Sequence, residues 1–119
     1  MGPDLDVSVY KSGDISVIGL SGDVDTFTCA KLRDAVAQLI DAGVSWVVIN
    51  MSAVDYIDSS GLGTLVGALR RVNESQGGLA ISNAAPQVLK VLNITGLSKV
   101  FALYQDDHQA AVSLSEMKN

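Results

Sequence analysis

Apolar and polar residues alternate from residue 6 to residue 11, as they do in a strand with one buried face. Residues 12–14, Ser-Gly-Asp, are a typical turn, and residues 15–20 are apolar enough for a second strand. Because a connection this short joins antiparallel strands, the chain is predicted to open with a β-hairpin. Residues 21–26 are predicted to form a polar loop that ends in residues favoured at helix starts.

A first helix is indicated by the residues after this loop. Its inner face is defined by apolar residues at helical spacing: Leu32, Val36, Leu39 and Ile40. Gly43 is a typical helix stop. Cys29 lies near the same face and is interpreted as a small core residue rather than a reactive thiol, because no adjacent base or cation pattern accompanies it.

Residues 45–50 are almost continuously apolar and β-branched, which is typical of a strand covered on both faces. The helix predicted after them has one apolar stripe, made of Leu62, Leu65, Val66, Leu69 and Val72. This second helix is predicted to end at Gly77-Gly78, before a short strand at residues 79–82.

A third helix is predicted to start around Pro86, with four residues facing inward: Val88, Leu89, Leu92 and Ile94. Gly96 ends it, residues 100–104 form a last strand, and Asp106 begins a final helix. Strands that alternate with helices imply crossover connections and parallel neighbours. We therefore expect residues 1–119 to form one α/β domain, with an antiparallel hairpin, a mainly parallel mixed sheet and about four helices.

The composition is that of a globular protein, with 48% hydrophobic and 18% charged residues. A net charge of -5 argues against nucleic acid as a partner, because Lys and Arg must neutralise its phosphates. The N-terminus lacks the pattern of a signal peptide, and the strongest apolar run, residues 46–49, is too short to span a bilayer. We expect a cytoplasmic protein that does not insert into membranes and has no cofactor.

Candidate chemistry concentrates in residues 54–63, where the apolar strand leads into the second helix. Ser59 and Ser60 lie at the predicted helix start, between Asp58 and Gly61. A helix start leaves backbone N–H groups without intrahelical partners and carries partial positive charge, so an oxygen-rich group is favourable there. The two serines could cap the helix, act as nucleophiles or accept a modification.

Catalysis by Ser59 is disfavoured by its surroundings. The chain order of Ser59, residues 106–107 and His108 matches an α/β-hydrolase triad. The nucleophile elbow, however, requires Gly-x-Ser-x-Gly, and Ile57 occupies the first glycine position. His108 is the only histidine and is interpreted as a solvated helix residue.

Other ligand sites lack their signatures as well. A Walker phosphate loop requires Gly-Lys-Ser/Thr, and no lysine lies between Lys31 and Lys90. A receiver-type domain would have an aspartate at the end of its central strand, where this chain has Asn50. Asp23 and Asp25 could bind a cation, but loop acids near helix starts are usually solvated, and no Cys/His cluster has zinc-site spacing. We therefore predict no metal site.

The second helix contains Gly61, Gly63 and Gly67, although each interior glycine costs about 1 kcal/mol relative to alanine. A helical wheel places four residues opposite the apolar stripe: Gly63, Thr64, Gly67 and Arg71. Tight packing against a neighbouring helix would explain any single glycine. Together with the serine junction, these small residues favour an outer surface onto which another protein packs.

Residues 58–63, Asp-Ser-Ser-Gly-Leu-Gly, with Val-Asp-Tyr-Ile before them, closely resemble the signature of the STAS domain. The similarity is greatest to the single-domain bacterial anti-sigma factor antagonists. Residues 20–25 resemble that family's loop after the second strand, and residues 93–101 resemble its later Gly-Leu segment. The predicted order of elements agrees with the family over essentially the full length.

The resemblance implies a regulatory protein that is not an enzyme. In such antagonists the serine directly after the aspartate, here Ser59, is phosphorylated by an anti-sigma factor that is itself a kinase using ATP. The unphosphorylated antagonist binds the anti-sigma factor and frees the sigma factor, and a phosphatase restores it. The neighbours of the phosphorylation site would be Asp23, Asp58 and Ser60. The residues expected to contact the partner are Asp25, Gly61, Gly63, Thr64, Gly67 and Arg71.

Elementary electrostatics makes such a switch plausible. Phosphorylation adds about -1.5 to -2 charges, which a helix start tolerates locally. Asp23, Asp25, Asp55 and Asp58 are expected nearby, so the modified surface would become strongly negative. A tenfold loss of binding requires only about 1.4 kcal/mol. The expected switch is therefore local rather than a refolding of the domain.

A second hypothesis retains the fold and changes the role. STAS domains also resemble soluble subunits of lipid-transport ABC complexes and parts of stress-signalling assemblies. In that case the surface of the second helix would be a constitutive docking site without a phosphate cycle.

Overall fold

The computed structural model describes residues 4–119, and its elements alternate as the sequence predicts. In chain order they are β1 (Leu5–Ser12), β2 (Ile15–Val24), α1 (Cys29–Asp41), β3 (Trp46–Ile57), α2 (Ser59–Glu74), β4 (Gly78–Ser82), α3 (Pro86–Thr95), the 3-10 helix η1 (Leu97–Lys99), β5 (Ala102–Tyr104) and α4 (Asp107–Lys118).

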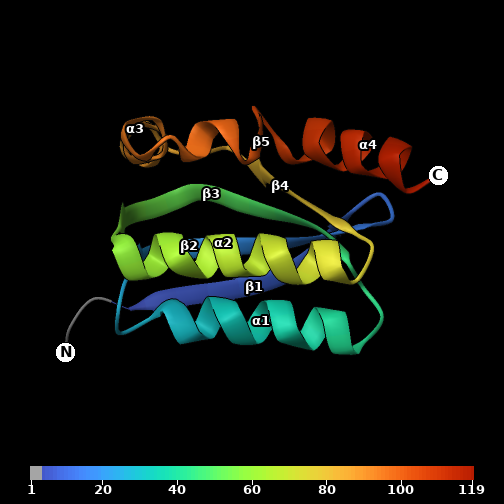
Figure 1. Ribbon diagram of the computed structural model, residues 1–119, viewed down its shortest axis with the longest axis horizontal. Coiled ribbons are helices and arrows are strands. Elements are labelled where there is room, and N and C mark those ends of the chain that lie inside the picture. Colours follow the sequence, from blue (N-terminus) through green and yellow to red (C-terminus); the bar gives the residue numbers. More distant parts are fainter. Residues whose placement is uncertain (1–3) are drawn as a thin grey trace.

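The strands form one mixed sheet in the order β1-β2-β3-β4-β5 (Figure 1). β1 and β2 pair antiparallel across the turn at Gly13, and every later pair is parallel. Parallel neighbours need a crossover connection, and each of these connections contains a helix. The predicted α/β class, opening hairpin and mixed sheet are therefore confirmed.

Helices cover both faces of the sheet, and the central strand is buried from both sides. α1, α2 and α3 share one core cluster, in which Val47 and Ile49 of β3 take part. α4 packs on the other face, where its Leu114 joins Val48. Because neighbouring residues of a strand point to opposite faces, this arrangement explains the continuous apolar run at residues 45–50.

Two strands are longer than the sequence pattern indicates, and this corrects the predicted loops. Residues 21–24 continue β2 instead of forming a loop, and residues 51–57 continue β3. The two extensions pair with each other, and Val24 lies opposite Ile57. Register shifts within the β2–β3 pair interrupt the alternation of period two by which a strand is recognised.

The ends of the helices confirm part of the prediction. Gly43 and Gly96 follow α1 and α3 with φ of 85° and 79°, the left-handed conformation that favours glycine. α2 instead ends at Glu74, and Gln76 has the positive φ, 62°. The prediction that Ile94 faces inward is wrong, because its side chain is 75% exposed. It lies two residues after buried Leu92, and two residues on a helix point in very different directions.

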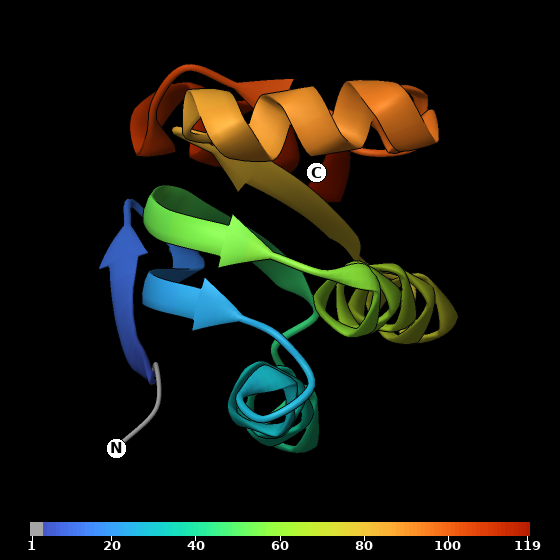
Figure 2. The ribbon, with the colours of Figure 1, turned by 90° about the vertical axis from the view of Figure 1, so that its left-hand side faces the viewer.

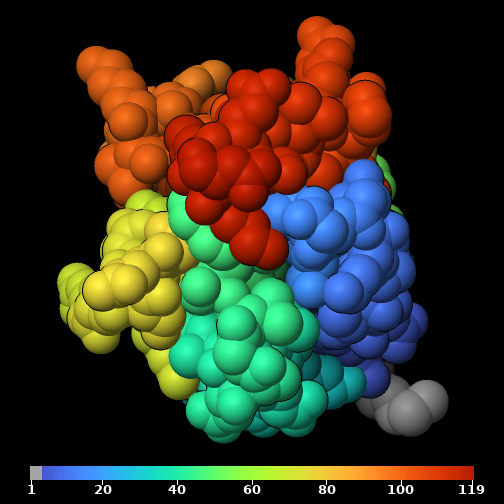
Figure 3. Space-filling view, turned by 90° about the vertical axis from the view of Figure 1, so that its right-hand side faces the viewer, coloured from blue at the N-terminus to red at the C-terminus, as the bar shows by residue number. Residues whose placement is uncertain are grey.

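The start of α1 and the start of α2 lie at the same end of the molecule. Figure 2 looks onto this end, where β2 and β3 finish side by side. Figure 3 shows the opposite end, where the C-terminal end of α2 (yellow) and the β1–β2 turn (blue) lie on opposite sides, with the C-terminal ends of α1 and α4 between them. Parallel pairing of β2 and β3 thus brings the polar residues after each strand together. In the part of the chain described, no helix has the length and apolarity needed to cross a bilayer.

Candidate functional site

Asp58 forms the whole connection between β3 and α2 and caps the helix. Its backbone is extended, and its Oδ1 accepts a hydrogen bond of 2.9 Å from the backbone N–H of Gly61. Its own N–H donates to the carbonyl oxygen of Val24 at 3.2 Å. An aspartate at this position satisfies one of the free N–H groups of the helix start. Asp58 therefore positions the start of α2 against the end of β2.

The other carboxylate oxygen of Asp58 binds the turn before α1. Asp58 Oδ2 accepts from the backbone N–H of Thr26 at 3.3 Å and lies 3.5 Å from its hydroxyl. The Thr26 hydroxyl is also 3.0 Å from the hydroxyl of Ser60. Asp58, Thr26 and Ser60 thus form a polar network, here called the capping network, that joins the starts of α1 and α2.

Ser59 lies outside the capping network. It is the first residue of α2 and is exposed, whereas Ser60 is only half-exposed. Within residues 4–119 the hydroxyl of Ser60 has a partner in Thr26, and that of Ser59 has none. The two adjacent serines are therefore chemically different: one hydroxyl is occupied by the fold and the other is available to a partner.

Gly61 is required by close approach of the backbone. A Cβ atom there would lie 2.3 Å from the carbonyl oxygen of Val24 and 2.9 Å from a side-chain carbon of Ile57. Such distances essentially never occur for real Cβ atoms. Gly61 is buried, so its role is to let α2 begin directly on the sheet rather than to contact a partner.

Asp25 is likewise used within the fold. Its side chain is 9% exposed, and its Oδ1 accepts from the backbone N–H groups of Phe27 (2.9 Å) and Thr28 (3.1 Å). The carboxylate therefore stabilises the turn before α1. Asp23 is half-buried within β2, where it pairs with Tyr56 of β3. The burial of Asp25 and Gly61 does not support their predicted direct contact with a partner.

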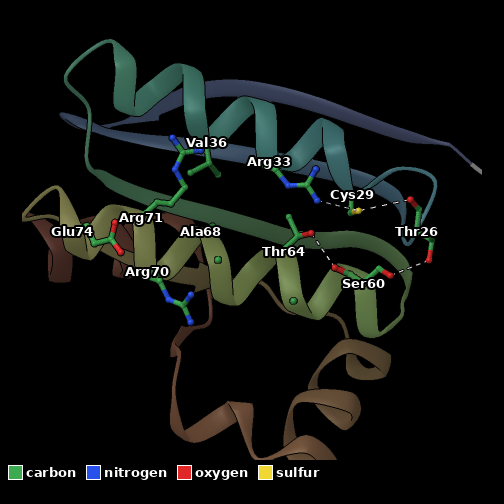
Figure 4. A pocket seen from close by; sticks show the side chains of 12 residues that line it. Thr26, Cys29, Arg33, Val36, Ser60, Thr64, Ala68, Arg70, Arg71 and Glu74 are labelled. Carbon is green, nitrogen blue, oxygen red and sulfur yellow. Dashed lines mark hydrogen bonds between the residues drawn. The ribbon is translucent and has the colours of Figure 1, made fainter.

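A groove of about 600 Å³ runs between α1 and α2 (Figure 4). The residues that line it are Thr26, Cys29, Arg33, Val36, Ser60, Gly63, Thr64, Gly67, Ala68, Arg70, Arg71 and Glu74. At the end near the capping network, the Sγ of Cys29 lies 3.7 Å from a guanidinium nitrogen of Arg33. Cys29 itself is 8% exposed, so its predicted role as a small core residue is confirmed.

Four of the residues predicted to form a partner surface line this groove: Gly63, Thr64, Gly67 and Arg71. The prediction that Thr64 lies on the outer face of α2 is wrong, because this residue is only 9% exposed. Its hydroxyl donates to the backbone carbonyl of Ser60 at 2.9 Å. The helical wheel identified a free face of α2, but neighbouring α1 covers one edge of that face. The surface is therefore the wall of a groove between two helices.

Some residues near the site were not identified from the sequence. The side chain of Phe27 is 90% exposed in the turn before α1, and that of Tyr56 is 54% exposed near the end of β3. Arg33 extends the charged lining of the groove onto α1. Tyr56 belongs to the Val-Asp-Tyr-Ile segment of the family signature, but no pattern marks its exposure or the positions of Phe27 and Arg33. These depend on how β2, β3 and α1 are placed relative to one another. Asp55 is also exposed, one residue before Tyr56 on β3.

The residues of the rejected hydrolase triad are not assembled. His108 is exposed on α4, which covers the sheet face opposite to α2. Its neighbour Asp107 accepts hydrogen bonds from Tyr10 (2.7 Å), Asn50 (3.0 Å) and Ser82. Burial raises the pKa of the Tyr10 hydroxyl, and so does its bond to Asp107. Among residues 4–119 no cluster of His, Cys, Asp and Glu could hold a metal ion.

Comparison with known proteins gives one family match. The STAS domain family matches residues 6–110. Among curated proteins, the chain is similar to the anti-sigma F factor antagonist of Paenibacillus polymyxa, with 25% identity over 112 residues, which is 93% of this chain and 96% of that protein.

Solved structures show the same architecture. An anti-sigma factor antagonist from Mycobacterium paratuberculosis superposes with a TM-score of 0.83 and 25% identity, covering 93% of this chain and 94% of the other. The Bacillus cell fate determinant SpoIIAA in its phosphorylated form gives a TM-score of 0.70 and 23% identity, over 91% of this chain and 98% of the other. This second similarity shows the fold alone.

Proposed function

The chain belongs to the STAS-domain family, and from that premise we propose that it is an anti-sigma factor antagonist switched by phosphorylation of Ser59. Unphosphorylated, it binds an anti-sigma factor that is a serine kinase and so releases a sigma factor. Phosphorylation abolishes this binding, and a phosphatase restores it. The proposal takes residues 1–119 as one STAS domain that acts in the cytoplasm, without a cofactor and without enzymatic activity of its own.

The observation that carries this proposal is the difference between the two serines. Ser59 is exposed at the first position of α2, and no side chain within residues 4–119 occupies its hydroxyl. Ser60 interacts with Thr26. A kinase must bring the acceptor hydroxyl to the γ-phosphate of ATP, so an exposed and unoccupied hydroxyl is the favourable acceptor. Curated relatives such as the Paenibacillus polymyxa protein are anti-sigma factor antagonists, which supports the same role here.

The electrostatic surroundings support a local switch. A phosphate on Ser59 would add about -1.5 to -2 charges next to the Asp58 carboxylate. The free N–H groups of the helix start offset part of this repulsion within the domain. A partner that packs against the start of α2 would instead meet added bulk, added negative charge and a group that is costly to desolvate. Binding is therefore weakened without unfolding of α2.

The test is phosphorylation of the full chain by its partner kinase, with the modified residue mapped by mass spectrometry. Ser59→Ala should bind the kinase normally and accept no phosphate, and Ser59→Asp should bind at least tenfold more weakly, a loss of about 1.4 kcal/mol. Ser60→Ala is the matched control and should still be phosphorylated. Phosphate on Ser60 alone, or none on the wild-type chain, would refute the proposed switch.

A second candidate function is favoured by the α1–α2 groove, whose lining does not include Ser59. The groove could serve as a constitutive docking site in a lipid-transport ABC complex or a stress-signalling assembly, without a phosphate cycle. Purification from the native host distinguishes the two functions. A transporter ATPase that co-purifies equally with wild-type chain and Ser59→Asp would favour constitutive docking over the switch.

A further inference from the structure

All three arginines of the chain line the α1–α2 groove: Arg33, Arg70 and Arg71. Arg33 and Arg71 lie between the two helices, and the side chain of Arg70 extends from the edge of α2 away from α1 (Figure 4). None of the five lysines does. The groove also contains Glu74 as its single acidic residue. In a protein with a net charge of -5, this groove is thus a local concentration of positive charge, and the charge is carried only by guanidinium groups.

None of these guanidinium groups forms a salt bridge within the part of the chain that the structure describes. Within residues 4–119 the salt bridges are Lys31–Asp4 and Lys118–Asp14, neither of which involves an arginine. Arg33 contacts the Cys29 sulfur, and all three arginines are exposed. Arginine presents a planar fork of donors that matches a carboxylate in a bidentate pair. The groove therefore presents guanidinium groups whose N–H donors are available to a bound partner.

The glycines of α2 indicate what kind of ligand fits. A Cβ at Gly63 or Gly67 would have no heavy atom within 4 Å, in contrast to the clash at Gly61. Packing within the domain therefore does not require these two glycines, although each costs about 1 kcal/mol in a helix. Spaced four residues apart, they lie on one face of α2. They allow the backbone of another protein to approach α2 closely.

We propose that the α1–α2 groove binds an acidic amphipathic helix of the partner protein. The less polar side of this helix faces α2, where its backbone approaches Gly63 and Gly67, and its Asp or Glu side chains pair with the arginines. This inference rests on the proposed partner-binding role and adds the chemistry of the bound segment. It also extends the contact surface beyond the start of α2, where Ser59 lies.

A helix fits this groove better than an extended segment. The walls are two helices, and an added strand would need an unpaired sheet edge, which the order of the strands places at β1 and β5. From Gly63 to Glu74 the wall formed by α2 is about 16 Å long, which corresponds to about three turns of a helix. Carboxylates two turns apart on the partner would therefore reach arginines near both ends of the groove.

The experiment uses the full chain with a photo-reactive benzoylphenylalanine at Glu74, expressed in the organism that carries this protein. The chain also carries Ser59→Ala, because this variant is expected to bind the partner and cannot be released by phosphorylation. After illumination, the cross-linked peptide is sequenced by mass spectrometry. We expect a segment with helical periodicity and at least two acidic residues on one side. No cross-link, or a cross-link to a segment without acidic residues, would overturn the proposal.

Charge-reversed variants test the role of the arginines. Arg70→Glu with Arg71→Glu should lower the cross-link yield at least tenfold, and reversal of the partner's acidic residues to Arg should restore it. The matched control, Lys90→Glu with Lys99→Glu, changes the same charge at exposed lysines in α3 and η1. Equal yields in the two double variants would refute an electrostatic role of the groove.

Gly67→Leu tests the close approach separately, because it fills open space and leaves the charges unchanged. It should also reduce the cross-link at least tenfold while the far-ultraviolet circular dichroism stays that of the wild type. The phosphorylation state of wild-type Ser59 is measured in parallel cells. Phosphate on wild-type Ser59 together with no cross-link from the Ser59→Ala chain refutes only the groove proposal, and a cross-link without phosphate on wild-type Ser59 refutes only the switch.

Discussion

The starts of α2 and α4 have the same local construction and different consequences. Each is capped by an aspartate whose side chain accepts the N–H group three residues later: Asp58 from Gly61 at 2.9 Å and Asp106 from Gln109 at 2.8 Å. The first helical residues are Ser59 and Asp107. Asp107 accepts hydrogen bonds from three side chains on three strands, whereas Ser59 engages no side chain within residues 4–119.

The difference shows how a fold can leave one helix start available. α4 lies across the sheet, so β1, β3 and β4 each present a polar side chain to its first turn. The first residue of α2 has no such neighbours, because the capping network uses Asp58, Thr26 and Ser60 and leaves Ser59 outside. Polar groups that the fold satisfies contribute to stability, and a polar group that it leaves free can contribute to recognition.

The largest expected effect comes from Gly61, the third residue of α2. Gly61→Val should destabilise the protein by about 3 kcal/mol, because its Cβ would overlap the Val24 carbonyl and force α2 away from β2. Gly63→Ala is the control, and it should be neutral or stabilise by up to about 1 kcal/mol. Urea unfolding followed by circular dichroism measures both. Equal stability of the two variants would contradict the close approach at Gly61.

The second-largest effect is the difference in stability expected between substitutions at the first residue of α4 and the first residue of α2. Asp107→Ala should lower the free energy of unfolding by about 2 kcal/mol, since it leaves the buried hydroxyl of Ser82 without its acceptor and removes one of the two acceptors of the Asn50 amide. Ser59→Ala should change it by no more than about 0.5 kcal/mol, as expected for a surface residue. Denaturant titrations of the two variants, side by side, measure the difference. A costly Ser59→Ala would show that Ser59 is structural.

A smaller effect depends on pH. The pKa of Tyr10 is raised in the folded state, so the folded protein holds this proton more tightly than the unfolded chain does. The stability contributed by the neutral hydroxyl is present below pH 10, the ordinary pKa of tyrosine, and is lost as the pH rises through the folded pKa. Tyr10→Phe should therefore lose less stability than the wild type above about pH 10.

The contribution of Asp107 to this shift can be measured directly. The tyrosinate absorbance of the wild type minus that of Tyr10→Phe gives the titration of Tyr10 alone. In an Asp107→Asn background its midpoint should be lower, because the carboxylate raises the pKa. An unchanged midpoint would show that burial alone causes the shift.

The smallest effect concerns which serine is modified. Thr26→Val removes the hydroxyl that interacts with Ser60, at a cost of no more than about 1 kcal/mol in stability. If a kinase modifies this site, the fraction of phosphate on Ser60 should rise about 2- to 10-fold, as expected for release of one hydrogen bond. Phosphopeptide mapping measures the ratio. Thr95→Val removes a hydroxyl on α3 and should leave the ratio unchanged.

Much of the site could be predicted from the order of residue types. The two serines at the end of an apolar strand indicated a helix start, although the residue that caps it is Asp58 and not a serine. Glycine spacing on α2 indicated a free face. Burial could not be predicted in the same way. Thr64 was assigned to a partner surface from the helical wheel, and Asp25 from the family resemblance. Thr64 is instead buried in the wall of the α1–α2 groove, and the turn before α1 uses the carboxylate of Asp25.

The sequence by itself determined the alternation of strands and helices, the opening hairpin and the position of the two serines, since these depend on local periodicity and on residues that start or stop a helix. Only the tertiary structure decided that Ser59 is free while Ser60 is engaged, and that Arg33 of α1 and Arg71 of α2 lie across one groove from each other. The physical reason is that parallel pairing of β2 with β3 brings two distant turns together. A hydroxyl is occupied or available only through the neighbours that this pairing provides.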